Sequence, residues 1–287
     1  MIREPVVAGA FYGATQGECE RQVAHYLAEA GSTQDVGGRV FGGLVPHAGW
    51  MFSGRVAARV LARVAAVRPA VVVVFGAMHR ARGRQAALFA SGAWDSPLGR
   101  IKIDARLAER VLGHTNLIVG DPYAHEAEHS IEVVVPFIQH LLPECQLLPI
   151  LVPPSAQAEE VGKAVARTLE SYRYDAVVIG SSDLTHYGPR YQFTPQGTGA
   201  QANRWAKEVN DAALLRKVLT LDASGALSTS VQDRSACGGG AIAATMAAVA
   251  ALGATRAVLL EHTSSAEVLS AECEGEDSVG YAGVVFA

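Results

Sequence analysis

The sequence lacks the features that would place it in a membrane or on nucleic acid. It has no uninterrupted apolar run of about 18 residues, so we expect no transmembrane helix. The first residues, MIREPVVAGAFYG, lack the basic stretch and apolar core of a signal peptide. The formal net charge of −4 gives no sign of a basic surface. We therefore expect no contact with nucleic acid or with an anionic membrane.

Cysteine is also scarce, and its spacing excludes a disulfide scaffold. The four cysteines, Cys19, Cys145, Cys237 and Cys273, form no CxxC pair, and free thiols fit a reducing cytoplasm. Neither a Walker sequence nor the GxGxxG spacing of dinucleotide-binding folds is present. Hydrophobic residues make up 49% of the chain and charged residues 18%, which provides for a large core. We expect a soluble cytoplasmic protein.

Strand-like and helix-like stretches alternate along the chain. Unbroken apolar runs such as AVVVVFG indicate strands covered on both faces, whereas apolar residues spaced i, i+3, i+4 indicate amphipathic helices. The expected strands span 40–46, 70–76, 86–91, 146–153, 175–183, 256–265 and 278–287. The expected helices span 53–67, 104–112, 130–142, 158–171, 202–219 and 238–253, with Pro136 either kinking the third or marking its start.

This alternation predicts an α/β fold. We expect a single domain over residues 1–287, with a mostly parallel central sheet and helices on both faces. The last two strands have no obvious helix between them, so an antiparallel edge is expected at the C-terminus.

Chemically active side chains follow the predicted strands. His47 comes after 40–46, and His79 after 70–76. Ligands of open α/β sheets bind outside the carboxyl ends of the strands, so these side chains are expected to meet there. Together with Cys237, the two imidazoles make a three-ligand set that leaves positions open, as catalytic metal sites require.

Further candidates lie near these ligands. Asp183 and His186 follow the strand that begins at 175, where His186 suits a general base and Asp183 its orienting partner. His129, next to Glu128, suits a hydrogen bond to a substrate or to a metal ligand.

Each feature also has a simpler interpretation. A single His after a strand is usually a hydrogen-bonded turn residue, and a single Cys is usually a small buried apolar one. His125 and His129 satisfy HExxH, but the segment begins a helix and lacks a third ligand at the zincin spacing. The glycines after Cys237 suit an anion at a helix N-terminus, whose dipole would also favour the thiolate.

Taken together, five stretches resemble the Memo family in order and spacing. They are VPHAGWMFSG, FGAMH, EHSIEVVVPF, GSSDLTHYG and ACGGGAI. The resemblance implies a fold similar to that of class III extradiol dioxygenases. For bacterial members it also implies a place as the B component of the AmmeMemoRadiSam system, with a radical-SAM protein as partner.

The resemblance also implies roles for individual residues. His47, His79 and Cys237 correspond to the metal ligands of the family, for which iron and copper are the metals. His186 takes the place of the general base of ring-cleaving relatives, with Asp183 and His129 in the same pocket. Those relatives use a carboxylate as third ligand, whereas a thiolate is softer, so ring cleavage does not follow from the fold.

Three functions are compatible with these residues. The first is a mononuclear oxidoreductase that uses Fe²⁺, O₂ and a small substrate, with His186 moving protons. The second is a metal-binding or partner-binding protein without turnover, which holds copper or iron or serves as a subunit of a radical-SAM-associated system. The third is a zinc hydrolase built on the same His/His/Cys set.

Overall fold

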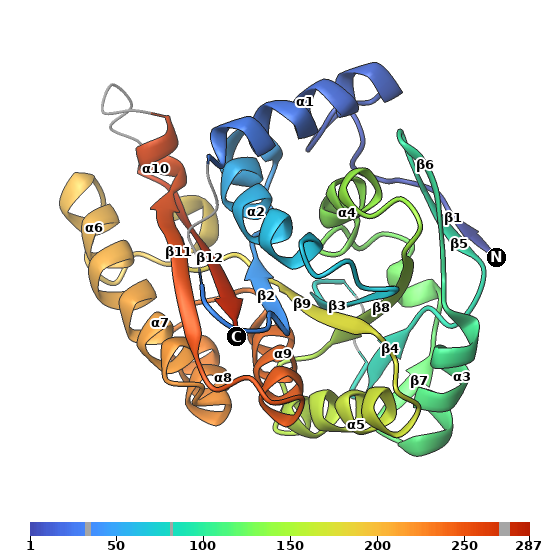
Figure 1. Ribbon diagram of the computed structural model, residues 1–287. Helices are drawn as coiled ribbons and strands as arrows, with labels where there is room; N and C mark the ends of the chain where they lie inside the picture. Colours follow the sequence, from blue (N-terminus) through green and yellow to red (C-terminus); the bar gives the residue numbers. More distant parts are fainter. Residues whose placement is uncertain (32–35, 81–82, 270–275) are drawn as a thin grey trace.

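A nine-stranded sheet forms the centre of the molecule (Figure 1), in a computed structural model that describes residues 1–31, 36–80, 83–269 and 276–287. The strand order is β10-β12-β2-β9-β3-β8-β4-β7, and β11 also pairs with β12. These strands are β2 (Gly42–Val45), β3 (Val71–Ala77), β4 (Ala86–Leu88), β7 (Ile118–Gly120), β8 (Gln146–Val152), β9 (Ala176–Ser181), β10 (His186–Tyr187), β11 (Ala257–Ser264) and β12 (Ser278–Phe286). A separate small sheet contains β1 (Ile2–Arg3), β5 (Ala93–Ser96) and β6 (Gly99–Lys102).

The four central strands of the large sheet are parallel. β2 pairs with β9, β9 with β3, and β3 with β8. Antiparallel strands flank this centre, because β12 runs opposite to β2 and β11, and β4 runs opposite to β8. The predicted sheet and its antiparallel C-terminal edge are therefore confirmed. The antiparallel β4 was not expected, but it follows β3 after only residues 78–85, too few for the crossover that a parallel strand needs.

Helices cover both faces of the sheet, as predicted. Along β3, Val72 and Val74 face one core, whereas Val73 and Phe75 face the other. The first core is closed by α1 (Gln16–Glu29), α2 (Trp50–Ala65) and α4 (Val135–Leu141). The second is closed by α3 (Ala105–His114), α5 (Ala158–Ser171), α7 (Ala212–Leu219), α8 (Ala223–Gln232) and α9 (Gly239–Ala251). With both faces covered, the site must lie at an edge formed by strand ends.

Several local predictions needed correction. Residues 130–142 form a short 3₁₀ turn, η2 (Glu132–Val134), followed by α4, so Pro136 marks the start of the helix rather than a kink. The predicted helix 202–219 comprises α6 (Ala200–Trp205), the π-helical η4 (Ala206–Asp211) and α7. A four-residue helix, α10 (Ser265–Val268), follows β11. Strand 86–91 already ends at Leu88, and Cys273 lies outside the described residues.

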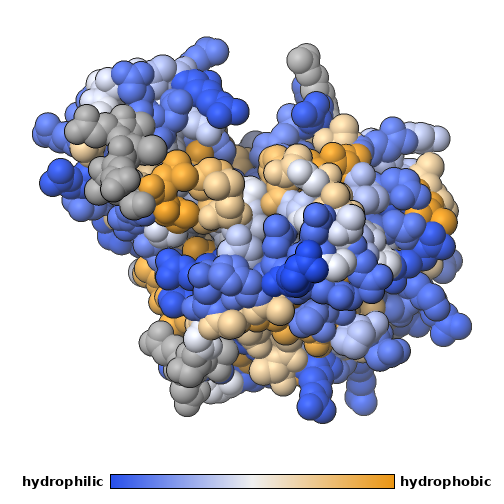
Figure 2. All heavy atoms as spheres, turned by 90° about the horizontal axis from the view of Figure 1, so that it is seen from above, coloured by the Kyte–Doolittle hydropathy of each residue, from blue (hydrophilic) through white to orange (hydrophobic). Residues whose placement is uncertain are grey.

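Among the helices of the described residues, none has the length and apolar character needed to cross a membrane. Seen from above (Figure 2), the surface is largely hydrophilic, and its apolar residues form separate patches.

Candidate functional site

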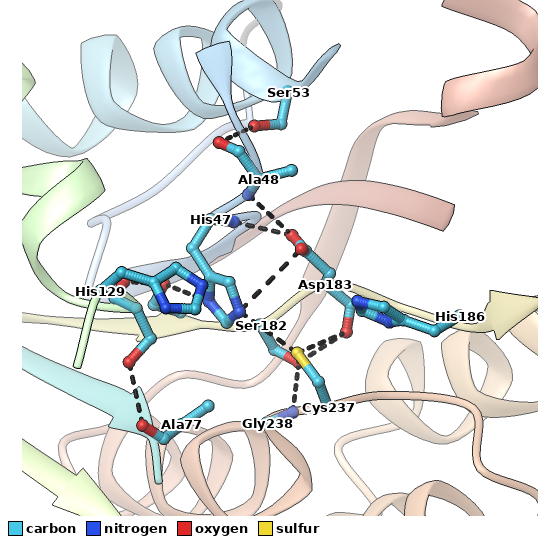
Figure 3. A network of polar contacts seen from close by, with 12 residues as sticks. His47, Ala48, Ser53, Ala77, His129, Ser182, Asp183, His186, Cys237 and Gly238 are labelled. Atoms are coloured by element: carbon cyan, nitrogen blue, oxygen red, sulfur yellow. Dashed lines mark hydrogen bonds and ion pairs between the residues drawn. The ribbon is translucent and has the colours of Figure 1, made fainter. Parts of the chain in front are cut away.

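Three neighbouring parallel strands, β2, β9 and β3, end beside one another. Figure 3 shows His47, Asp183 and Cys237 lying close together there. His47 stands two residues beyond β2, His79 two beyond β3, and Asp183 two beyond β9. Cys237 approaches from the loop before α9. The ligand atoms of His47, His79 and Cys237 lie within 4.8 Å of one another. The fold thus brings together three groups that are separated by up to 190 residues.

The orientation and tautomer of His47 are fixed by its second ring nitrogen. Its side chain is almost fully buried, and Nδ1 lies 3.0 Å from Oγ of Ser181. The Ser181 hydroxyl donates its only hydrogen to the carbonyl of Ser130, at 2.6 Å, so it can only accept from His47. Nδ1 therefore carries the hydrogen, and Nε2 presents its lone pair toward Cys237, whose Sγ lies 3.2 Å away.

His79 is held in the same way, but by a charged group. Its Nδ1 donates to Oε1 of Glu128 at 2.9 Å, and its backbone N–H donates to Oε2 at 2.8 Å. Glu128 is almost fully buried and also accepts from the backbone N–H groups of His129 and Ser130. Burial alone would raise the pKa of Glu128, but these hydrogen bonds hold it well below its usual range. Because the ionised Glu128 carboxylate accepts the hydrogen of Nδ1, the other ring nitrogen of His79, Nε2, is available to bind a metal.

The site favours a thiolate at Cys237. Burial alone would raise the pKa of this thiol, but the charges and hydrogen bonds of His47 and His79 lower it to about 5. Cys145, buried without such neighbours, has a pKa raised to about 11. Burial would lower the pKa of His79, but its hydrogen bonds to Cys237 and Glu128 raise it to about 10. Without a cation the imidazoles share their protons with the thiolate, and a bound cation would displace these protons.

These three residues fit a metal ion. Ligands about 2.0–2.3 Å from a tetrahedral ion stand roughly 3.6 Å apart, close to the 3.2 Å between His47 Nε2 and Cys237 Sγ. Both imidazoles have Nδ1 hydrogen-bonded, which is the outer-shell arrangement that orients metal-bound histidines. Mixed imidazole and thiolate donors suit iron, copper and zinc.

Asp183 does not contact His186 as the sequence analysis expected. Its Oδ1 accepts from the backbone N–H groups of His47, at 2.8 Å, and Ala48, at 3.2 Å. Its carbonyl accepts from the backbone N–H of Cys237 at 3.3 Å. Asp183 therefore ties the loop after β2 to the loop before α9, and so sets the spacing of two candidate ligands.

His186 is oriented by a backbone group instead. Its Nδ1 lies 3.1 Å from the carbonyl of Leu184, which can only accept, so Nδ1 carries the hydrogen. Nε2 is then the basic nitrogen. The ring packs edge-on against Tyr191 and lines a cleft of about 710 Å³ that also includes His129 and Asp183.

The two histidines of the HEAEH segment have different surroundings. His125 is fully buried between the rings of Phe89 and Trp94, and its Nε2 lies 3.0 Å from the carbonyl of Ala87. His129 faces the cleft and stacks on His79. Burial and the charge of His47 lower the pKa of His129 to about 4, so this imidazole is neutral at pH 7. The zincin interpretation therefore has no geometric support, because only His129 lies at the site.

The glycines after Cys237 have a packing role. A Cβ on Gly238 would lie 2.8 Å from the Ser182 side chain, and one on Gly240 only 2.3 Å from the carbonyl of Pro153. Gly238 also donates its backbone N–H to Ser182 Oγ. These contacts account for the CGGG sequence without a bound anion.

The sequence alone does not reveal the roles of Glu128 and Ser181. Glu128 and Ser181 hold the Nδ1 atoms of His79 and His47. Both lie in the stretches AHEAEHSIE and GSSD, which do carry a signal, namely an acid between two histidines and two serines at a strand end. Their partners are distant in the sequence, however, so local patterns do not reveal the pairing.

Comparison with known proteins gives matches over nearly the whole chain. The family model described as "Memo-like protein" matches residues 3–285. A MEMO1 family protein of Pyrobaculum aerophilum is 36% identical and covers 99% of both chains. One of Methanothermobacter thermautotrophicus is 34% identical over 98% of this chain and 99% of its own. Among solved structures, an uncharacterized protein (JW3007) of Escherichia coli K12 matches 80% of this chain and 91% of its own, with a TM-score of 0.46 and 13% identity.

Proposed function

The chain belongs to the Memo family, and from this premise and the geometry of the site we propose a mononuclear iron redox enzyme in which His47, His79 and Cys237 hold the ion. The observation that supports this most strongly is that both imidazoles have Nδ1 engaged, while Nε2 of His47 lies 3.2 Å from Sγ of Cys237 and the ligand atoms of all three residues lie within 4.8 Å of one another. A ferrous ion bound there would supply redox chemistry toward O₂, and three protein ligands would leave positions for small molecules.

The surrounding residues bind and move protons. His186, with Nδ1–H on a backbone carbonyl, accepts a substrate proton at Nε2. His129 is neutral at pH 7, so it offers the substrate a hydrogen bond without adding positive charge beside the ion. Asp183 keeps both loops in place and is buried away from solvent, so its role in this proposal is positional.

Oxygen uptake tests the proposal. Protein loaded with Fe²⁺ under anaerobic conditions should consume O₂ when a reductant or a catechol is added. Cys237→Ser at the same total iron should consume it only at the rate of iron in buffer, and Cys145→Ser, which alters a cysteine outside the site, should behave as wild type. Wild-type uptake no faster than iron in buffer with every reductant and catechol would contradict the enzyme assignment.

The other outcomes point to other functions of the same site. Tight iron or copper binding without oxygen uptake indicates a metal-binding subunit, for example beside a radical-SAM protein. Hydrolysis with Zn²⁺ and none with iron indicates a zinc hydrolase, which the His/His/Cys set also suits.

A further inference from the structure

The cleft beside the site extends well beyond the residues that would touch a metal. Its volume, about 710 Å³, is within the usual range for small-molecule sites. Its lining includes His129 and His186, which are half-buried, and Arg190, which is exposed. Its walls come from residues 9–14, from α1, from the start of α2 and from a 3₁₀ turn, η3 (Pro189–Tyr191). Such a cleft has room for a molecule larger than O₂ or water.

Aromatic rings dominate the apolar part of these walls. Phe11 packs edge-on against His129, with ring centroids 5.1 Å apart, and Tyr191 packs edge-on against His186 at 4.9 Å. Phe52 also lines the cleft. Flat rings offer faces and edges on which another ring packs favourably. These walls therefore suit a ligand with a flat ring.

The charged side chains in the cleft differ in whether they are already paired. The Glu18 carboxylate accepts the backbone N–H of Thr15 as part of the α1 capping box. Asp183 is buried and accepts two backbone N–H groups. Arg190 makes a hydrogen bond through its backbone N–H to Asp277, but within the described ranges no acidic side chain forms an ion pair with its guanidinium group.

Since no acidic side chain of the described residues pairs with it, the Arg190 guanidinium group can bind one negative charge. Arginine binds a carboxylate through two parallel hydrogen bonds. A dianionic phosphate is usually bound by more than one cation. Among the described residues that line the cleft, Arg190 is the single Lys or Arg, and Glu18 and Asp183 are acidic. With one guanidinium group and two carboxylates in the wall, a monoanion paired with Arg190 is favoured over a dianion.

We propose that the cleft binds a small ring-bearing carboxylate, with Arg190 pairing with the carboxylate near the opening and the ring extending toward His186 and His129. The proposal rests on the proposed function in one respect, the direction of the ligand ring, which lies beside the histidines that would act on it. The contact with Arg190 does not depend on a metal.

Three matched probes test this assignment: 4-hydroxyphenylacetate, neutral 4-ethylphenol and cationic tyramine. Their affinities are measured by calorimetry on the full chain, with and without bound metal. Wild type should bind the acid about tenfold more tightly than the neutral probe, the effect of one charge-assisted contact. Arg190→Gln should abolish this preference and leave 4-ethylphenol unchanged, Arg190→Lys should keep part of it, and Arg167→Gln on α5 should keep all of it.

Several results would overturn the assignment. These are equal affinity of wild type for acid and neutral probe, tighter binding of tyramine, a preference that survives Arg190→Gln, or no measurable binding of the acid at millimolar concentration. Tighter, Arg190-dependent binding of phenyl phosphate would replace the carboxylate by a phosphate. If the acid preference holds in metal-free protein while oxygen uptake fails, only the proposed redox function is wrong.

Discussion

His79, in the loop after β3, and His125, at the end of the 3₁₀ turn η1 (Tyr123–His125), have pKa shifts of opposite direction. Burial alone would lower the pKa of each. His79 faces Cys237 and the Glu128 carboxylate, which raise its pKa to about 10. The His125 ring has a neutral hydrogen-bond partner, the Ala87 carbonyl. Its burial, together with the charge of Arg3, lowers its pKa to about 4. The two rings differ in burial, since the His79 side chain is partly exposed and His125 is fully buried. They also differ in their partners, and the charged partners account for the raised pKa of the candidate ligand.

The largest expected effect concerns the pH dependence of stability caused by His125. Its folded pKa, about 4, lies below the ordinary histidine value of 6.5, so between these values the unfolded chain binds more protons. The free energy of unfolding should therefore fall as the pH is lowered from 6.5 to 4, by up to about 3 kcal/mol from this residue.

Urea unfolding between pH 7 and 4.5 tests this expectation. His125→Gln keeps a donor for the Ala87 carbonyl but does not titrate. The free energy of unfolding of this variant should therefore depend less steeply on pH, because up to one fewer proton is taken up on unfolding. An equally steep dependence in the variant would show that His125 is not the titrating group. His129→Gln should be measured beside it, because the pKa of His129 is also lowered to about 4 and this residue should contribute to the same pH dependence.

Glu128→Gln tests the role of the charged partner of His79. The amide cannot supply the negative charge that holds Nδ1–H of His79, and its NH₂ group would face backbone donors. We expect metal affinity to fall about 10–100-fold, as is typical when the outer partner of a ligand is lost. Competition with a chelator measures this. Glu126→Gln, exposed in the same loop, should match wild type, and equal affinities for all three proteins would contradict the role of Glu128.

Ser181→Ala should have the smallest effect. It removes a neutral acceptor from Nδ1–H of His47, and a neutral hydrogen bond is worth about 1 kcal/mol, or roughly fivefold in metal affinity. The same chelator competition applies. Thr168→Val removes a buried hydroxyl on α5 and should change stability but not metal affinity. A larger loss in Ser181→Ala than in Glu128→Gln would reverse the proposed order of the two anchors.

Much of the site could be predicted because the topology of the sheet dictates it. Residues at the carboxyl ends of adjacent parallel strands must lie close together, so His47, His79 and Asp183 converge once the strands are recognised. The contacts of Asp183 could not be predicted, since they depend on how the loop after β2 turns back over β9. Helix α1 was also missed, although Thr15 and Glu18 form a capping box.

The most direct test of the central claim is the metal content of protein purified without oxygen, with wild type, Cys237→Ser and Cys145→Ser measured side by side. If His47, His79 and Cys237 form one metal site, wild type and Cys145→Ser should hold close to one ion per chain, and Cys237→Ser should lose most of it while remaining folded. Iron as that ion would support the proposed redox function. Wild-type protein that holds no metal under any loading condition, or Cys237→Ser that binds it as tightly as wild type, would contradict the site.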